Sequence, residues 1–173
     1  MKPIAREILR FLFQNPAGEF AYRELERKTG LSIGTVSTYV GELAKEGLIK
    51  TRKSSNSILV KANLDNPLFI HLKRAYNIEV LYSSGLVEHL AYSLRPDAMV
   101  VFGSYSRGED DEKSDIDIAI IHGRETISDV RRFEKILERK INMVRLKSLK
   151  GSRKEFVNSL ANGIVLAGAI EVF

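Results

Sequence analysis

The chain has 173 residues, of which 44% are hydrophobic, and carries a formal net charge of +5. This length suits one ordinary domain or two small ones, and the apolar fraction is that of a globular protein. No apolar run approaches the roughly 18 residues that span a bilayer, and Lys2, Arg6 and Glu7 interrupt the segment where a signal peptide would need an apolar core. Without cysteine, a disulfide framework and a thiolate zinc site are excluded. We therefore expect a soluble, cytoplasmic protein with no membrane partner.

The positive charge is unevenly distributed along the chain. Residues 1–62 contain 11 Lys+Arg and 6 Asp+Glu, which gives +5, whereas residues 63–173 contain 16 of each. The whole excess therefore lies in the first third. A basic N-terminal part joined to a charge-balanced remainder suggests that nucleic acid, if bound, meets the N-terminal part first.

Three helices are predicted in the N-terminal part. Apolar residues recur at helical spacing from Ile4 and stop near residue 15, and a second helix fits Tyr22 to Thr29. Ser32 is a suitable N-cap for a third helix that ends near residue 47. Gly34 and Gly41 lie inside this third helix, where each costs about 1 kcal/mol against alanine. We expect close helix packing to require them.

A β-hairpin is predicted next, from residues 48–53 and 58–60 with a polar tip at 54–56. Three helices followed by a basic hairpin resemble the winged helix-turn-helix, and LSIGTVSTYVGELAKEGLI resembles its recognition helix. The resemblance implies binding of double-stranded DNA, with a homodimer as a common arrangement of such regulators. A protein-binding helical module is the alternative. The residues expected to contact DNA are Thr35, Ser37, Thr38, Tyr39, Arg52 and Lys53.

The turn-rich segment Asn63 to Pro67 is the best domain boundary. It precedes a long, mostly helical stretch whose last helix runs from Leu86 to Leu94. We therefore expect a winged helix-turn-helix at 1–62, a helical connector at 63–96 that packs on the second domain, and that domain at 97–173.

The last domain shows alternating strand and helix signals, which predict an α+β fold built on a mixed, palm-like sheet. The acidic run at residues 109–112 is expected to be a solvated loop. In chain order, the predicted elements are a strand at 98–102, a motif loop, a strand at 116–121, a helix at 126–139, a strand at 141–146, a helix at 152–161 and an edge strand at 164–166.

The segment from residue 103 to 120, GSYSRGEDDEKSDIDIAI, carries the clearest chemistry. Its Gly103-Ser104 turn follows an apolar strand and lets the backbone approach a ligand closely. Asp115 and Asp117 are two residues apart on a strand, so they share one face while Ile116 points to the other. Paired carboxylates on one face can clamp a divalent cation. The alternative is a β-hairpin with solvated acids, which does not explain acids that flank a buried isoleucine beside a Gly-Ser turn.

The order of these blocks resembles the DNA polymerase β-type nucleotidyltransferase superfamily, above all its minimal members with G-S-x-x-R-G and S-D-I-D motifs. The resemblance implies that Asp115 and Asp117 are catalytic residues that hold Mg²⁺ or Mn²⁺. It also implies that Gly103, Ser104 and Arg107 bind the phosphates of an NTP. The family reaction transfers NMP from the NTP to a hydroxyl acceptor and releases pyrophosphate.

One position departs from the family pattern. A third carboxylate is expected on the strand after the next helix, and Asn142 occupies that position. An amide cannot take a proton and is a weak metal ligand, and loss of a general base typically lowers a rate by about 10² to 10⁴. Two hypotheses therefore stay open, an active nucleotidyltransferase and an impaired one that serves as a sensor or interaction module of a transcriptional regulator.

Overall fold

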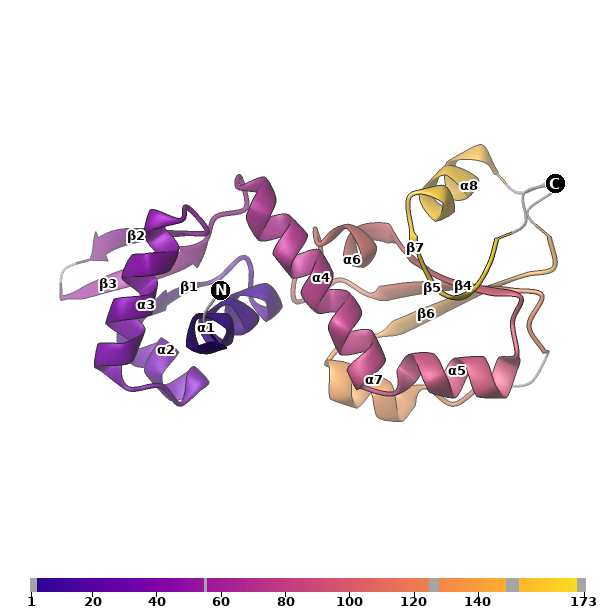
Figure 1. The fold of residues 1–173 in the computed structure, drawn as a ribbon, viewed down its shortest axis with the longest axis horizontal. Helices are drawn as coiled ribbons and strands as arrows, with labels where there is room; N and C mark the ends of the chain where they lie inside the picture. Colours follow the sequence, from indigo (N-terminus) through magenta and orange to yellow (C-terminus); the bar gives the residue numbers. More distant parts are fainter. Residues whose placement is uncertain (1–2, 55, 125–127, 149–152, 171–173) are drawn as a thin grey trace. The chain divides into compact units, whose positions relative to one another are not determined.

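The computed structural model describes residues 3–54, 56–124, 128–148 and 153–170 (Figure 1). The chain divides into two compact units, Met1–Tyr76 and Asn77–Phe173. Helix α4 (Pro67–Ser83) begins in the first unit and ends in the second. None of the described helices is long and apolar enough to cross a membrane.

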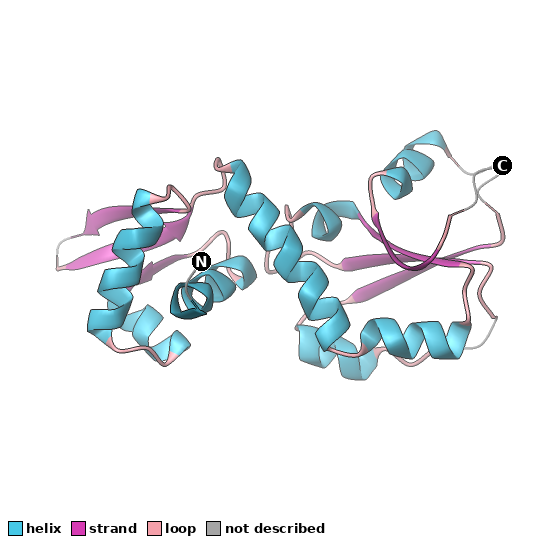
Figure 2. Ribbon diagram, viewed as in Figure 1, coloured by secondary structure: helices cyan, strands magenta, loops and turns pink. Residues whose placement is uncertain are grey.

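The first unit contains three complete helices, the first part of α4 and a small antiparallel sheet in the order β1-β3-β2 (Figure 2). Its core is formed by residues such as Ile8, Leu12, Val36 and Val40, all of which are fully buried. The three predicted helices and the hairpin are confirmed. Strand β1 was not predicted, because three residues are too few to show an alternating pattern. The elements are α1 (Pro3–Gln14), β1 (Glu19–Ala21), α2 (Tyr22–Thr29), α3 (Ile33–Lys45), β2 (Ile49–Ser54) and β3 (Ser57–Ala62).

Local signals explain where α2 and α3 begin and end. Gly30 adopts a left-handed conformation (φ 73°) that ends α2. The Ser32 hydroxyl then accepts a hydrogen bond from the Thr35 amide at 3.3 Å, which caps α3 as expected. The expected packing role of Gly34 and Gly41 is wrong, since a Cβ at either position would meet no atom within 4 Å.

The second unit contains a mixed four-stranded sheet in the order β6-β5-β4-β7. Only β5 and β6 run parallel to each other. The predicted α+β class with a mixed sheet is therefore confirmed, and β7 is the edge strand expected at 164–166. The elements after α4 are α5 (Leu86–Leu94), β4 (Ala98–Phe102), α6 (Gly103–Arg107), β5 (Ile116–Ile121), α7 (Arg131–Leu137), β6 (Ile141–Leu146), α8 (Lys154–Ala161) and β7 (Ile164–Gly168).

Successive side chains of β4 point to opposite faces of the sheet, and helices cover both faces. Met99 and Val101 belong to a core with residues of α5 and α7, whereas Val100 and Phe102 pack with Leu160 of α8. Figure 1 shows α5 and α7 on one side of this sheet and α8 on the other. All five residues of β4 are buried, which explains its uninterrupted apolar sequence.

Three predicted element boundaries differ from the structure. Residues 103–107 form the short helix α6 instead of a loop. The helix expected at 126–139 begins only at Arg131, whose amide donates to Asp129, and it ends at Leu137, where Glu138 follows in a left-handed conformation. Residues 126–127 and 152 of the predicted helices lie outside the described residues. Helix α8 begins at Lys154.

The open space beside Gly41 leads to a stability prediction. Gly41→Ala should raise the free energy of unfolding by about 1 kcal/mol, because alanine loses less backbone entropy in a helix and meets no neighbour. The control is Gly47→Ala, which should lower it by roughly 1–2 kcal/mol because Gly47 has φ 71°. Urea unfolding monitored by circular dichroism measures both. A Gly41→Ala protein less stable than wild type would show that α3 needs a glycine there.

Candidate functional site

Two acids and an amide meet at one edge of the larger sheet. Asp117 pairs in register with Phe102 of β4 and with Asn142 of β6, and Asp115 immediately precedes β5. The Asn142 Nδ2 group donates to Asp115 Oδ2 at 3.1 Å and to Asp117 Oδ1 at 3.2 Å. Both acids are half-buried. One amide group therefore bridges the two carboxylates and offsets part of their mutual repulsion.

Gly103 allows the Asp117 carboxylate to lie close to the backbone at the start of α6. It has φ 75°, and a Cβ at this position would lie 2.7 Å from Asp117 Oδ2. Only a residue without a side chain lets the carboxylate lie against the start of α6. Ser104, the next residue, is half-buried, and Arg107 at the end of α6 is exposed and bonded through Nε to Glu109 Oε2 at 2.7 Å. The Gly-Ser block and the acid pair are thus adjacent.

The loop between α6 and β5 is built by its own polar side chains. The Ser114 hydroxyl accepts from the Asp111 amide at 3.0 Å and donates to Asp111 Oδ1 at 2.9 Å. The hydrogen bond from the Ser114 hydroxyl, followed by one from the Lys113 amide, holds the pKa of Asp111 below its ordinary value. Ser114 of the S-D-I-D block therefore fixes the loop directly before Asp115.

Asp110 corrects the expectation of a solvated acidic loop at residues 109–112. It is only 3% exposed, and Asn77 of α4 donates to its Oδ1 at 2.7 Å and to the Tyr105 carbonyl at 2.9 Å. Burial of a carboxylate requires such partners. The uniformly acidic run gave no sign of this inward position, because only the tertiary contact with α4 reveals it.

The carboxylate oxygens of Asp115 and Asp117, beside Asn142 at the end of the sheet, form what we call the acid edge. They are suitable ligands for Mg²⁺. This cation takes oxygen ligands and commonly combines one or two carboxylates with water and substrate phosphates. Asp115 and Asp117 lie close enough for one amide to reach both. Among the residues that the structure describes, no group of three or more His, Cys, Asp or Glu could hold a metal. A cation here would therefore depend on the acid pair and on ligands from a substrate.

The residues of α3 that were expected to contact DNA differ in their exposure and in the hydrogen bonds they already make. Ser37 and Thr38 are exposed, and the Thr38 hydroxyl donates to the Gly34 carbonyl at 3.0 Å. The Thr35 hydroxyl lies 2.8 Å from that of Ser32 and takes part in the cap of the helix. Tyr39 is half-buried and packs against the core of the first unit. The exposed hydroxyl face of α3 is therefore centred on Ser37 and Thr38.

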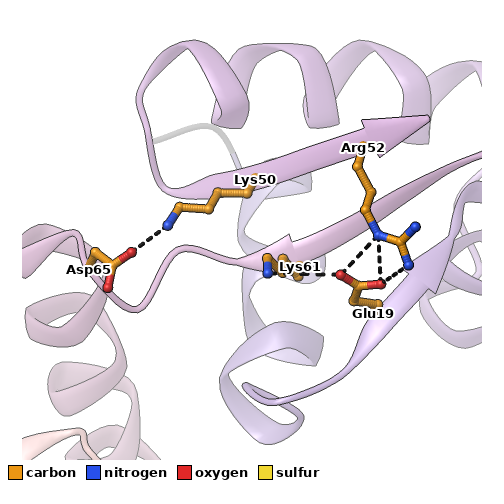
Figure 3. Close-up of polar contacts among 5 residues, drawn as sticks. All are labelled: Glu19, Lys50, Arg52, Lys61 and Asp65. Carbon is orange, nitrogen blue, oxygen red and sulfur yellow. Dashed lines mark hydrogen bonds and ion pairs between the residues drawn. The ribbon is translucent and has the colours of Figure 1, made fainter. Parts of the chain in front are cut away.

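Carboxylates hold most of the basic residues of the hairpin (Figure 3). Arg52 donates from Nε to both Glu19 oxygens, at 3.2 and 3.0 Å, and from a terminal nitrogen to Oε2 at 2.5 Å. Lys61 lies 3.9 Å from Glu19, and Lys50 pairs with Asp65. The bond from Arg52 holds the pKa of Glu19 below its ordinary value, so this carboxylate stays ionised at neutral pH. The sequence alone shows these bases but not their partners.

A surface groove of about 450 Å³ lies between the hairpin and the first residues of α2 and α3. Its lining includes Arg23, Ile33, Lys53, Asn56 and Ile58. Ile33 and Ile58 are 43% and 37% exposed, so both offer apolar surface there. Arg23 was not predicted to bind a ligand, because nothing in its local pattern separates it from an ordinary solvated helix start. Ile33 shares a helical face with Val36, Val40 and Leu43 in the sequence, yet unlike them it is exposed.

Two family models match the chain. Residues 86–169 match the family model described as polymerase beta, nucleotidyltransferase, and residues 1–50 match the model described as winged helix-turn-helix DNA-binding. No curated protein matches the chain. The chain therefore joins an N-terminal winged helix-turn-helix domain to a C-terminal nucleotidyltransferase-type domain.

The tight contact at Gly103 generates a prediction. Gly103→Ala should lower the free energy of unfolding by roughly 1–2 kcal/mol, because alanine disfavours φ 75° and its Cβ would displace Asp117. Urea unfolding measures the effect. Gly85→Ala is the control, since Gly85 has φ 79° but a Cβ there meets nothing within 4 Å. Equal losses in the two variants would mean that the Asp117 contact contributes nothing beyond backbone strain.

Proposed function

We propose that this chain is a DNA-binding transcriptional regulator whose second unit binds an NTP together with Mg²⁺ or Mn²⁺. The observation that carries the nucleotide part is the meeting of Asp115, Asp117 and the Gly103-Ser104 block at one sheet edge. The family matches to both domains support the pairing of the two activities. A protein that binds DNA and NTPs acts inside the cell, which agrees with the cytoplasmic location expected from the sequence.

The proposed roles follow from the chemistry of each group. Asp115 and Asp117 would hold the cation, which supplies positive charge to neutralise the nucleotide phosphates. Gly103 and Ser104 offer close backbone approach and a hydroxyl to those phosphates. Arg107 would contribute a guanidinium once it exchanges Glu109 for phosphate, a stronger and more highly charged acceptor.

Because of Asn142, we propose nucleotide binding, and not NMP transfer, as the main activity of the second unit. In NMP transfer, an acceptor oxygen forms a bond to the α-phosphorus, the bond to the bridging oxygen breaks, and pyrophosphate leaves while the hydroxyl proton passes to a base. Asn142 lies between the two acids, where it donates hydrogen bonds and cannot accept that proton. The site can therefore hold a cation and phosphates, while Asn142 supplies no base for the acceptor proton.

NMP transfer to a hydroxyl acceptor is the second candidate function. It is favoured by the intact Gly-Ser and double-acid blocks, which in the second unit lie in contact as a catalytic site would require. Positioning and charge stabilisation alone can supply much of such a catalytic effect. The acceptor would be a hydroxyl of a protein, a small molecule or a nucleic acid.

DNA binding is assigned to the exposed face of α3 and to the hairpin. Ser37, Thr38 and the neighbouring Thr35 offer short hydroxyl side chains for base edges and phosphates, and Tyr39 would contribute at most its outer edge. We propose double-stranded DNA as the partner and a homodimer as the bound form, because two-fold symmetric operators are read by paired recognition helices.

Nucleotide binding is tested with Asp117→Asn. This change should abolish the Mg²⁺-dependent thermal stabilisation that ATP or GTP confers on the protein, because one of two charged ligands is lost. The control is Asp97→Asn, the same chemical change at an acid bonded to His122 at the opposite end of β4, which should keep the stabilisation. Equal stabilisation of wild type and Asp117→Asn would contradict the assignment.

Turnover is tested separately with α-labelled NTPs. We expect wild type to label no acceptor, and Asn142→Asp to gain transfer activity with Mg²⁺ or Mn²⁺ because it restores a third carboxylate. Asn142→Asp should also be less stable without a cation and recover stability when Mn²⁺ is added. Labelling by wild type that Asp117→Asn abolishes would instead establish the enzyme and exclude the function as a sensor alone.

DNA binding is tested on the recognition helix. Ser37→Glu should weaken binding of the full chain to duplex DNA by at least roughly tenfold, because a carboxylate would face phosphate. Ser83→Glu, at an exposed serine of α4 in the second unit, is the matched control and should leave affinity unchanged. Fluorescence anisotropy at fixed salt measures both. Equal affinities of wild type and Ser37→Glu would mean that DNA binds elsewhere on the protein or does not bind at all.

A further inference from the structure

We propose that Glu19 withholds Arg52 from DNA, so that the backbone phosphates at the hairpin are bound by Lys53 and, across the groove, by Arg23. This inference rests on the proposed DNA binding and assigns its phosphate contacts. It changes the expectation from sequence, which placed Arg52 beside Lys53 at the phosphates. The ligand is the sugar-phosphate backbone of duplex DNA.

Arg52 is already occupied by a bidentate partner of full negative charge. Its Nε and terminal nitrogen make three contacts of 3.2 Å or less with the Glu19 carboxylate. The pair spans β1 and β2, the two outer strands of the small sheet (Figure 3). If Arg52 moved to a phosphate, the Glu19 carboxylate would face DNA, and among the described residues Lys61, 3.9 Å away, is the cation left to offset its charge. Like charges at an interface disfavour such an exchange.

Lys53 and Arg23 differ from Arg52 in this respect. Within the described residues, neither side chain makes a hydrogen bond or an ion pair, and both are exposed. They border the same groove, Lys53 from the hairpin and Arg23 from the first turn of α2. Two unpaired cations that face one groove can bind an anionic ligand without first giving up a partner.

The rest of the groove suits a DNA backbone. Ile33 and Ile58 present apolar surface to a deoxyribose, and Asn56 offers a neutral hydrogen-bonding group. The groove also adjoins the N-terminal residues of α3, the end of a recognition helix that approaches base edges. Phosphates bound there would therefore fix the register of α3 on the duplex.

The test measures affinity of the full chain for a random-sequence DNA duplex at several salt concentrations, because phosphate contacts appear in the slope of log affinity against log salt. Arg23→Gln and Lys53→Gln should each weaken binding and reduce the slope by about one. Lys45→Gln, at an exposed lysine at the far end of α3, is the matched control. It should leave the slope unchanged.

Variants of Glu19 test the same pairing by releasing Arg52. Glu19→Gln should strengthen binding and steepen the slope by about one, because it releases Arg52 to phosphate. Glu24→Gln changes the net charge equally at a carboxylate that has no ion pair within the described residues, and it should produce no such gain. The gain should also vanish in the double variant Glu19→Gln/Arg52→Gln. Circular dichroism verifies that each variant is folded.

Arg52→Gln alone should keep the wild-type slope. A slope reduced as much as in Lys53→Gln would overturn the proposal, and so would a Glu19→Gln gain that persists without Arg52. An Arg23→Gln protein indistinguishable from Lys45→Gln would exclude the groove as the phosphate site. These outcomes leave DNA binding itself intact, whereas a wild-type protein without salt-dependent binding would overturn the proposed function as well.

Discussion

Strand register at the edge where β4, β5 and β6 meet controls what the second unit can do. Side chains alternate along a strand, so a slip of one residue would turn Asp117 toward the α5 and α7 core and bring Ile118 to the site. The buried isoleucines of β5 oppose that slip because they fill the core on the other face. The same register places Asn142 beside Asp117. Packing on one face of the sheet therefore fixes the polar geometry of the other.

Much of this architecture could be predicted because it depends on local signals. Ser32 before an apolar helix and the uninterrupted apolar sequence of β4 each determine structure over a few residues. Asp110 could not be placed correctly, since its burial depends on Asn77, 33 residues away. The three-residue strand β1 forms only because β3 lies beside it. Predictions failed where a tertiary partner, and not the local pattern, decides the conformation.

In the candidate sites too, some features follow from the local sequence and others depend on tertiary contacts. Periodicity correctly placed Asp115 and Asp117 on one face, since strand geometry alone dictates it. The availability of a basic side chain is different, because it depends on which carboxylate folding brings near. Lys50, Arg52 and Lys53 are close in sequence, yet Asp65 and Glu19 pair with the first two. The charge excess of the first unit therefore overstates the number of cations that can meet DNA without first exchanging a partner.

Asn142 gives the acid edge a property that a third carboxylate would not. Three close carboxylates repel one another and need a cation to be stable, whereas two carboxylates bridged by an amide already have a partner of opposite polarity. A cation that binds here must displace hydrogen bonds from Asn142, which weakens its net affinity. Occupancy would then depend strongly on the phosphates that an NTP brings as further ligands. Under the proposed function such a site would respond to nucleotide and metal together, as a sensor requires, while Asn142 stands where the third carboxylate of transfer chemistry was expected.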